Sequence, residues 1–296
     1  MAVNPPRAGE RRLHPRAGLR PVDVLLLAYV AIVSVVALVR APTQPGCWWL
    51  LAAHAQIVLL IYLTSRRGLG PFGRSIREFY PLFLLVALYG ALDVLNLNVS
   101  RTYDAMVRGW EEAIFGGQPS RTWWQTHPSA FWSTVLHGAY LSYYLILLAP
   151  ALWFAARRDF IAMRRFVFLV MATFAVCYLF FIFLPVAGPY YEFPRPTGMF
   201  VDNLMAKLVY GGLASGSSYG AAFPSSHVAA TLAATVAAWR GDRRLGMALA
   251  VPATLLTISV VYCQMHYAVD AIAGLLVGGL ISWATLRAER RRELWH

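Results

Sequence analysis

The sequence has few charged residues: Asp, Glu, Lys and Arg together make up 14% of its 296 residues. A soluble domain usually carries about 25% charged residues, whereas here 58% of the residues are hydrophobic and the mean hydropathy is +0.53. This composition excludes an ordinary soluble enzyme, a disordered chain and a fibrous protein. It indicates an integral membrane protein, in agreement with the long apolar runs of the chain.

Cysteine and acidic residues are also scarce. The three cysteines, Cys47, Cys177 and Cys263, do not make a disulfide framework. Only 14 acidic residues oppose 26 basic ones, and the formal net charge of +12 could suggest a nucleic-acid partner. In a membrane protein, however, the loops that carry the basic residues matter more than the sign of the net charge. We therefore expect no nucleic-acid partner.

Eight apolar runs are long enough, or nearly so, for a helix that crosses a bilayer, which needs about 20 residues. They lie at 21–39, 46–64, 79–97, 131–155, 166–186, 226–240, 245–262 and 266–286. We predict an all-α, polytopic membrane helix bundle of about eight spans. No repeat or linker divides the chain, so 21–296 is predicted to form a single membrane domain. The Pro- and Arg-rich tail 1–20 is predicted to be disordered.

Basic residues alternate from loop to loop. Twenty of the 26 fall before the first run and after the second, fourth, sixth and eighth runs. The six on the other side are Arg40, Arg101, Arg108, Arg121, Arg195 and Lys207. Because basic loops stay cytoplasmic, both termini are predicted to be cytoplasmic, in the plasma membrane of the cell. The segments 98–130 and 187–224 then face the outside.

Both outer segments carry more than a simple loop needs. In 101–115 the apolar residues Tyr103, Met106, Val107, Trp110 and Ile114 share one helical face. This pattern predicts an amphipathic helix on the outer surface or a loop helix packed on the bundle. The segment 187–224 is long for a membrane loop, and such loops are usually functional.

The start of the sixth run has the chemistry of a phosphate site. Pro224 and Ser225 are a helix-start signal, and the free N–H groups of a helix start can bind an anion. Ser225 and Ser226 add hydroxyl groups, and His227 lies in the first turn. The alternative is a capped helix with an incidental histidine.

His266 and Asp270 lie four residues apart at the outer start of the eighth run, where i and i+4 share a helix face. Asp270 can accept a hydrogen bond from one imidazole nitrogen and leave the other nitrogen as a nucleophile. The alternative is a polar pair between helices. His227 and His266 are at the same membrane face, so two His and one Asp could also ligate zinc. A metal site needs no phosphate cradle, and we expect no metal.

Two motifs resemble those of the type 2 phosphatidic acid phosphatase superfamily. Pro224-Ser225-Ser226-His227 is similar to its Pro-Ser-Gly-His motif, and Ser259, His266 and Asp270 match the spacing of its Ser-Arg-x5-His-x3-Asp motif. The resemblance covers roughly 166–287, and the motifs fall within 187–287. It implies a six-helix lipid-phosphatase-like core.

The sequence departs from that pattern at two cationic positions. Of the superfamily's Lys-x6-Arg-Pro motif, Arg195-Pro196 is present, but Gly188 occupies the Lys position; Val260 replaces the Arg of the third motif. Without that Arg, the run 266–270 resembles the inositol phosphorylceramide synthase and sphingomyelin synthase branch, the inositolphosphotransferases. A looser similarity to this branch extends over 79–287.

The resemblance implies a mechanism without a metal or organic cofactor. His266 attacks phosphorus and forms a phosphohistidine, Asp270 orients His266, and His227 protonates the leaving alkoxide and then deprotonates the incoming hydroxyl. Ser225, Ser226 and Arg195 hold the non-bridging phosphate oxygens, through helix-start and charge-assisted contacts.

Four further residues are candidates for the acceptor site: Tyr190, Tyr191, Asp93 and Asn96. The tyrosines could equally be interfacial anchors, and Asp93 and Asn96 could serve hydrogen bonds between helices. We predict a membrane enzyme that transfers a phosphoryl or phospho-headgroup from a lipid substrate to a hydroxyl acceptor, a polyol or lipid alcohol, at the outer leaflet. The alternatives are a phosphatase for phosphatidic acid or polyprenyl phosphate, which uses water, and a lipid transporter. The sequence does not indicate an oligomeric state.

Overall fold

The structure is a computed structural model that describes residues 18–66, 69–99, 101–216, 218–290 and 295. Most of the predicted tail 1–20 therefore lies outside the described residues. Within the described part, every regular element is a helix, and the only pairing of strand type is an isolated parallel bridge between Val186 and Ala221. The predicted all-α fold class is confirmed.

Seven helices of the described residues are long and apolar enough to cross a membrane, and they confirm an integral membrane protein. They are α1 (Pro21–Arg40), α2 (Gly46–Ser65), α3 (Pro71–Leu95), α6 (Ala130–Ala156), α7 (Phe160–Phe183), α11 (Arg243–Tyr262) and α12 (Ala268–Glu289). The run predicted at 226–240 forms α10 (Ser226–Gly241), which has 16 residues. At 1.5 Å per residue it rises about 24 Å, less than the hydrocarbon thickness of about 30 Å. It lies inside the bundle, in contact with α6, α7, α11 and α12.

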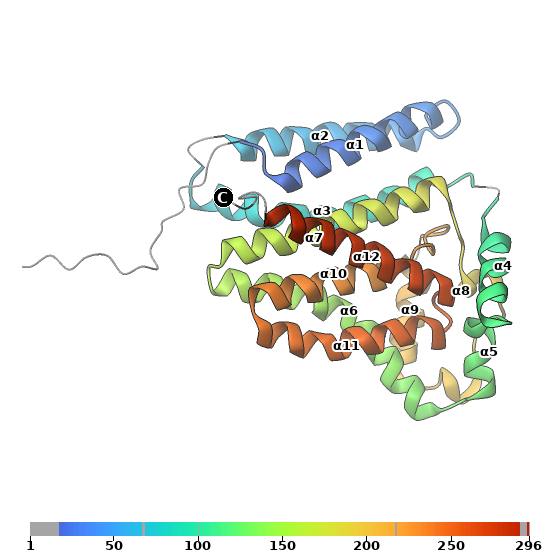
Figure 1. Cartoon of the computed structure of the whole chain (residues 1–296). Helices are drawn as coiled ribbons and strands as arrows, with labels where there is room; N and C mark the ends of the chain where they lie inside the picture. Colours follow the sequence, from blue (N-terminus) through green and yellow to red (C-terminus); the bar gives the residue numbers. More distant parts are fainter. Residues whose placement is uncertain (1–17, 67–68, 100, 217, 291–294, 296) are drawn as a thin grey trace, which may run out of the picture.

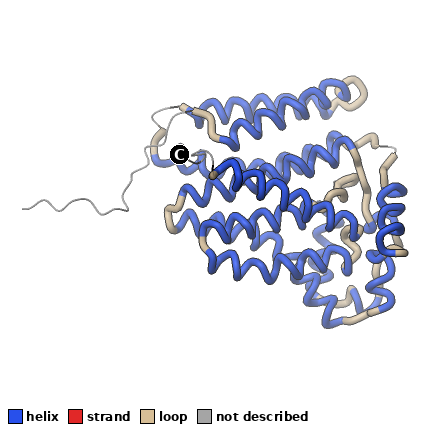
Figure 2. The backbone as a smooth tube through the Cα atoms, in the orientation of Figure 1, coloured by secondary structure: helices blue, strands red, loops and turns tan. Residues whose placement is uncertain are grey.

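The long helices run along one direction, and the short elements gather at one end of the bundle (Figure 1). These short elements are α4 (Asp104–Phe115), α5 (Pro119–Thr126), α8 (Pro189–Glu192), the 3-10 helix η1 (Gly198–Phe200) and α9 (Leu204–Gly216). Figure 2 shows the longest loops at the same end. The segments 98–130 and 187–224 thus share one end, and α1 begins and α12 ends at the other. The side of the membrane that each end faces stays a prediction.

Helices α10 and α12 approach each other closely because small residues line their contact. A Cβ atom on Gly274 would lie 2.5 Å from the Ser225 carbonyl oxygen, and one on Gly278 would lie 2.5 Å from that of Ala229. Glycine therefore allows the backbones to touch, as in other membrane helix pairs. This contact brings together the starts of the two helices that carry the predicted catalytic motifs.

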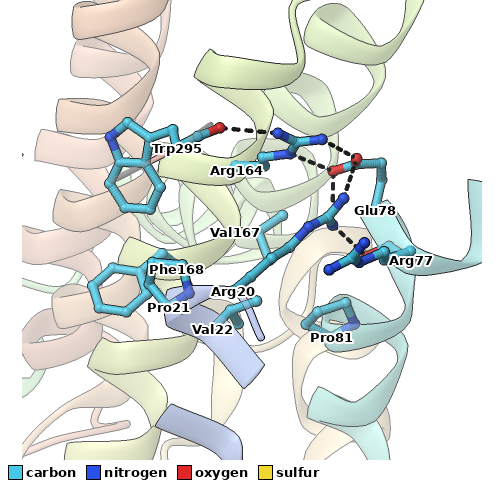
Figure 3. A pocket seen from close by; sticks show the side chains of 10 residues that line it. All are labelled: Arg20, Pro21, Val22, Arg77, Glu78, Pro81, Arg164, Val167, Phe168 and Trp295. Carbon is cyan, nitrogen blue, oxygen red and sulfur yellow. Dashed lines mark hydrogen bonds and ion pairs between the residues drawn. The ribbon is translucent and has the colours of Figure 1, made fainter. Parts of the chain in front are cut away.

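An ion-pair network closes the opposite end of the bundle (Figure 3). Glu78 of α3 binds Arg20 before α1 and Arg164 of α7, at 2.6 and 2.8 Å, and the Trp295 carbonyl accepts a hydrogen bond from Arg164 at 2.9 Å. All three charged side chains are largely buried. Since an unpaired buried charge is costly, Glu78 stabilises both guanidinium groups and fixes Arg20, a residue of the predicted tail.

Candidate active site

The start of α10 is tied to the start of α12. The hydroxyl of Ser225 caps α10 by accepting a hydrogen bond from the Val228 N–H at 3.4 Å. The N–H of Ser225 itself donates to the Asp270 carbonyl at 2.9 Å. The N–H groups of Ser226 and His227 come next in the first turn, where a helix offers them no carbonyl partner. This is the geometry of an anion site.

His227 lies between two tyrosines of α6. Its Nε2 is 3.2 Å from the hydroxyl of Tyr140, and its ring centroid is 4.5 Å from that of Tyr143. Its Nδ1 is buried and has no hydrogen-bond partner among the described residues. The tyrosine contacts therefore hold the ring and leave Nδ1 for another partner. Sequence reasoning missed both tyrosines, whose only signal is a polar group on an apolar span.

His266 and Asp270 are adjacent, as their spacing predicts, but the predicted hydrogen bond between them is not formed: Nδ1 of His266 has no hydrogen-bond partner among the described residues. The Nδ1 atom of His266 is 3.4 Å from Oδ2 of Asp270, and the same oxygen accepts the Tyr267 N–H at 2.9 Å. Both side chains are buried. The ring centroids of His266 and His227 are 5.7 Å apart. The structure thus brings the three predicted catalytic residues into one cluster; their catalytic roles stay predictions.

Burial sets the protonation state of His266. It lowers the pKa of this imidazole to about 4, because a charged ring is poorly solvated there, although a hydrogen bond to the backbone of Ala222 opposes the effect. His266 is therefore neutral near pH 7 and retains a nitrogen lone pair. A neutral imidazole is the form that a nucleophile requires.

The family follows from comparison with known proteins. Residues 111–284, more than half of the chain, match the model of the PAP2 superfamily. The chain belongs to this superfamily. The match covers the whole histidine and aspartate cluster and confirms the superfamily that the two motifs predicted. It places the protein in phosphatase or phosphotransferase chemistry on lipid-like substrates. No curated protein and no solved structure matches the chain.

Gly188 and Val260 occupy the two positions where the PAP2 motifs have a cation. Gly188 has a φ of +92°, and a Cβ atom there would lie 2.8 Å from the Cβ of Ala222. Val260 is fully buried, and its carbonyl accepts the N–H groups of Met265 and His266 at 2.9 and 2.8 Å. The backbone conformation and the close contact therefore favour glycine at 188, and an apolar side chain fills the buried position 260.

Arg195 is the basic residue predicted to bind phosphate. It is exposed, and its guanidinium carbon lies 4.3 Å from the ring centroid of Tyr190. This distance is typical of a cation–π contact. Tyr190 is buried, whereas Tyr191 is exposed with its ring 5.3 Å from that of Tyr219. The predicted phosphate and acceptor roles of these residues remain open.

Asp93 and Asn96 hold the loop before α10. Asp93 accepts the hydroxyl of Ser218 at 2.6 Å, and Asn96 donates to the carbonyls of Phe181 and Tyr219 at 3.2 and 3.4 Å. The contact with Phe181 of α7 is a hydrogen bond between helices, as in the alternative interpretation, whereas the contacts with Ser218 and Tyr219 reach the loop. Binding of an acceptor by either side chain stays a prediction.

Gln264 joins three segments of the site and was missed in the sequence. Its side-chain oxygen accepts the indole N–H of Trp124 at 2.7 Å, and its amide nitrogen donates to the carbonyls of Pro194 and Pro189 at 3.0 and 3.4 Å. A glutamine between two apolar runs gives no sequence signal, because all of these partners are distant in the chain.

Helix α4 turns its polar side inward. Its buried residues are Asp104, Val107 and Glu111, whereas Tyr103 and Trp110 of the predicted apolar face are exposed. The two interpretations of 101–115 therefore both hold in part: α4 packs on the protein, and it also presents apolar side chains outward. The inward direction of its two carboxylates was not predicted.

No group of three or more His, Cys, Asp or Glu side chains suited to a metal ion occurs in the part of the chain that the structure describes. In the cluster of the three predicted catalytic residues, His266 lies between the other two: its ring is next to that of His227, and its Nδ1 faces Asp270.

Proposed function

We propose that this PAP2 protein transfers a phospho-headgroup, of the inositol-phosphate type, from a lipid phosphodiester to a hydroxyl acceptor. The observation that supports this most is that Gly188 and Val260 carry no charge where the PAP2 motifs have Lys and Arg. The proposal concerns the inositolphosphotransferase branch of the superfamily. The acceptor is a polyol or a lipid alcohol.

The charge of the substrate links these two positions to the reaction. A phosphomonoester carries about −1.5 to −2 charges at pH 7, whereas a phosphodiester carries a single negative charge. Each charge-assisted hydrogen bond is worth roughly 1.5–3 kcal/mol. A site with two fewer cations therefore loses more affinity for a monoester than for a diester. Arg195 supplies one positive charge, which matches the single negative charge of the diester.

The first step forms a bond between Nε2 of His266 and phosphorus. The bond from phosphorus to the lipid alkoxide breaks, and His227, which enters this step as the imidazolium, donates its proton to that alkoxide and becomes neutral. Asp270, 3.4 Å from Nδ1 of His266, orients the ring and stabilises its positive charge. The phosphate oxygens bind at the start of α10, to the N–H groups and hydroxyls of Ser225 and Ser226 and to Arg195.

The second step reverses the first with a new alcohol. His227 removes the proton of the acceptor hydroxyl, whose oxygen then attacks phosphorus while the bond to His266 breaks. The buried Nδ1 of His227 is available for both proton transfers, because Nε2 faces the Tyr140 hydroxyl. General acid–base catalysis of this type contributes about 10²–10⁴-fold to the rate.

The charge distribution supports an extracytoplasmic site. The cluster lies at the end of the bundle opposite the arginine-rich loops, and such loops stay in the cytoplasm. We propose that both termini are cytoplasmic and that the site opens at the outer leaflet of the plasma membrane.

The test compares two donors with the purified protein. Phosphatidic acid and a phosphatidylinositol-type diester are each incubated with and without a polyol, and free phosphate is separated from transferred headgroup. We expect headgroup transfer from the diester that depends on the polyol. Rapid phosphate release from phosphatidic acid, unaffected by any alcohol, would identify a phosphatase. Movement of intact lipid across the membrane of vesicles that contain the protein, without turnover of either donor, would instead favour the alternative of a lipid transporter.

A further inference from the structure

Helix α4 covers the two loops that carry the site (Figure 1). Val107 of α4 belongs to a small apolar cluster, separate from the main core, with Val186, Ala222, Tyr267 and Val269. These partners come from the loop before Gly188, the loop before α10 and the start of α12. The outer helix therefore contacts all three segments around the histidine pair.

Asp104 binds the first of these loops with both carboxylate oxygens. Oδ2 accepts the N–H of Ala187 and Oδ1 accepts that of Gly188, each at 2.8 Å. Oδ1 also accepts the hydroxyl of Tyr267 at 2.9 Å. The side chain is buried. One residue of α4 thus joins the loop before Arg195 to the residue that follows His266.

Glu111 binds the start of α12. Its Oε1 accepts the N–H of Ala268 at 2.7 Å, and Ala268 is the first residue of α12, two positions after His266. Glu111 is fully buried, and its Oε2 has no hydrogen-bond partner within the described residues. A carboxylate thus occupies an N–H group that a helix start would otherwise offer to an anion.

We infer that Asp104 and Glu111 are positioning residues, which act through the backbone to set His266 against the phosphate site at the start of α10. The inference rests on the proposed function and deepens it. The two carboxylates occupy the N–H groups of Ala187, Gly188 and Ala268, so the start of α10 is left as the place for the substrate phosphate. Neither residue contacts the reacting groups.

The inferred role of Glu111 depends on the length of its side chain and on its hydrogen bond with Ala268, rather than on its charge. Burial raises the pKa of Glu111 to about 7, although the hydrogen bond from the Ala268 N–H opposes the effect; Asp270 and Glu112 nearby add to it. A carboxyl group accepts the Ala268 N–H whether or not it carries a proton. An amide should therefore replace Glu111, whereas a shorter carboxylate should not reach Ala268.

Two conservative variants separate position from charge. We expect Glu111→Gln to keep kcat within about twofold, and Glu111→Asp to lower kcat about 100-fold, the effect of displacing a reacting group by about 1 Å. The KM for the lipid should stay unchanged, because Glu111 binds the backbone N–H of Ala268 and is not part of the proposed phosphate site. Glu112→Gln and Glu112→Asp are matched controls, since Glu112 is the exposed neighbour on the same helix, and both should behave as wild type.

An amide should not replace Asp104, in contrast to Glu111. Two N–H groups bind its two oxygens, and Asn offers only one oxygen, so its NH₂ group would face an N–H donor. We expect Asp104→Asn to lower kcat as strongly as Glu111→Asp. If Glu111→Asp were active and Glu111→Gln inactive, the charge of Glu111 would matter, and the inference would be overturned. Wild-type kcat in both Glu111 variants would also overturn it.

A second measurement needs no substrate and therefore separates this inference from the proposed function. Diethyl pyrocarbonate modifies exposed imidazole rings. His266 is buried, so its rate of modification reports whether the segment before α12 keeps its position. We expect Glu111→Asp to raise this rate and Glu111→Gln to leave it unchanged. An inactive wild type would reject the proposed function only, whereas equal modification rates in the two variants would reject the positioning by Glu111.

Discussion

His266 shows how burial prepares a single side chain for chemistry. A free imidazole has a pKa of about 6.5 and is partly charged near neutral pH. At the start of α12 the ring is buried, its Nδ1 faces Asp270, and its pKa falls to about 4. The same burial that costs solvation thus keeps the ring neutral. The proposed mechanism then uses Nε2 for the bond to phosphorus, while Nδ1 faces the carboxylate.

The nucleophile is tested by its removal. His266→Ala should lower kcat by roughly 10³–10⁶-fold, because residues of one catalytic unit fail together, and should abolish the phosphohistidine. Lipid turnover and acid-labile phosphoprotein are the measurements. His127→Ala is the control, since His127 is an exposed histidine at the same end of the bundle. Near-normal turnover by His266→Ala would contradict the mechanism.

The depressed pKa of His266 predicts the acid side of the pH profile. In the proposed mechanism the neutral ring is the active form, so activity should be present above the folded pKa and lost as the pH falls through about 4. We expect kcat/KM, measured from about pH 3.5 upward, to lose its His266-dependent part near pH 4. A midpoint near the ordinary value of about 6.5 would show that the ring is solvated.

At the scale of elements, the contact of α10 with α12 decides the site. The carbonyls of Ser225 and Ala229 lie where side chains at 274 and 278 would be, and the N–H of Ser225 donates to the carbonyl of Asp270. A wider separation of these two helices would break this hydrogen bond and move His227 away from His266. Glycine on α12 is therefore a requirement of the active-site geometry as well as of stability.

A pair of neighbouring glycines tests this contact. Gly278→Ala places a methyl group 2.5 Å from the Ala229 carbonyl oxygen, whereas at Gly279 the nearest atom is 4.0 Å away. We expect Gly278→Ala to lower the free energy of unfolding by about 1–3 kcal/mol, the usual effect of overpacking, and to reduce turnover. Gly279→Ala should change neither. Thermal unfolding in detergent measures the difference, and equal stability of the two variants would refute the close contact.

In the molecule as a whole, the basic loops and the candidate active site lie at opposite ends of the bundle. The arginine-rich loops and the Glu78 network lie at one end, and the histidine cluster lies at the other under α4 and α5. Basic loops resist translocation, so the same distribution that orients the protein also decides which leaflet the site faces. Orientation is thus a property of the whole chain.

Cysteine accessibility tests this orientation. The native Cys47, Cys177 and Cys263 are buried and should not react. Gln125 of α5 and Arg244 of α11 are exposed at opposite ends. An impermeant maleimide added to intact cells should label Gln125→Cys and spare Arg244→Cys, with both labelled after lysis. The reverse pattern would place the site at the cytoplasmic leaflet.

The sequence by itself determined the helical class, the alternation of the loops and the pairing of His266 with Asp270. These features follow from local patterns: apolar run length, loop charge and a spacing of four residues. Only the tertiary structure decided that α10 lies inside the bundle, that Tyr140 and Gln264 contact the site, and that α4 buries Asp104 and Glu111 while exposing Trp110. Such contacts join residues far apart in the chain, as Asp104 and Gly188 are, and they depend on which faces meet when the helices pack. Hydrophobic periodicity could not predict the buried face of α4, because two buried carboxylates are stabilised there by backbone N–H groups whose positions the fold alone supplies.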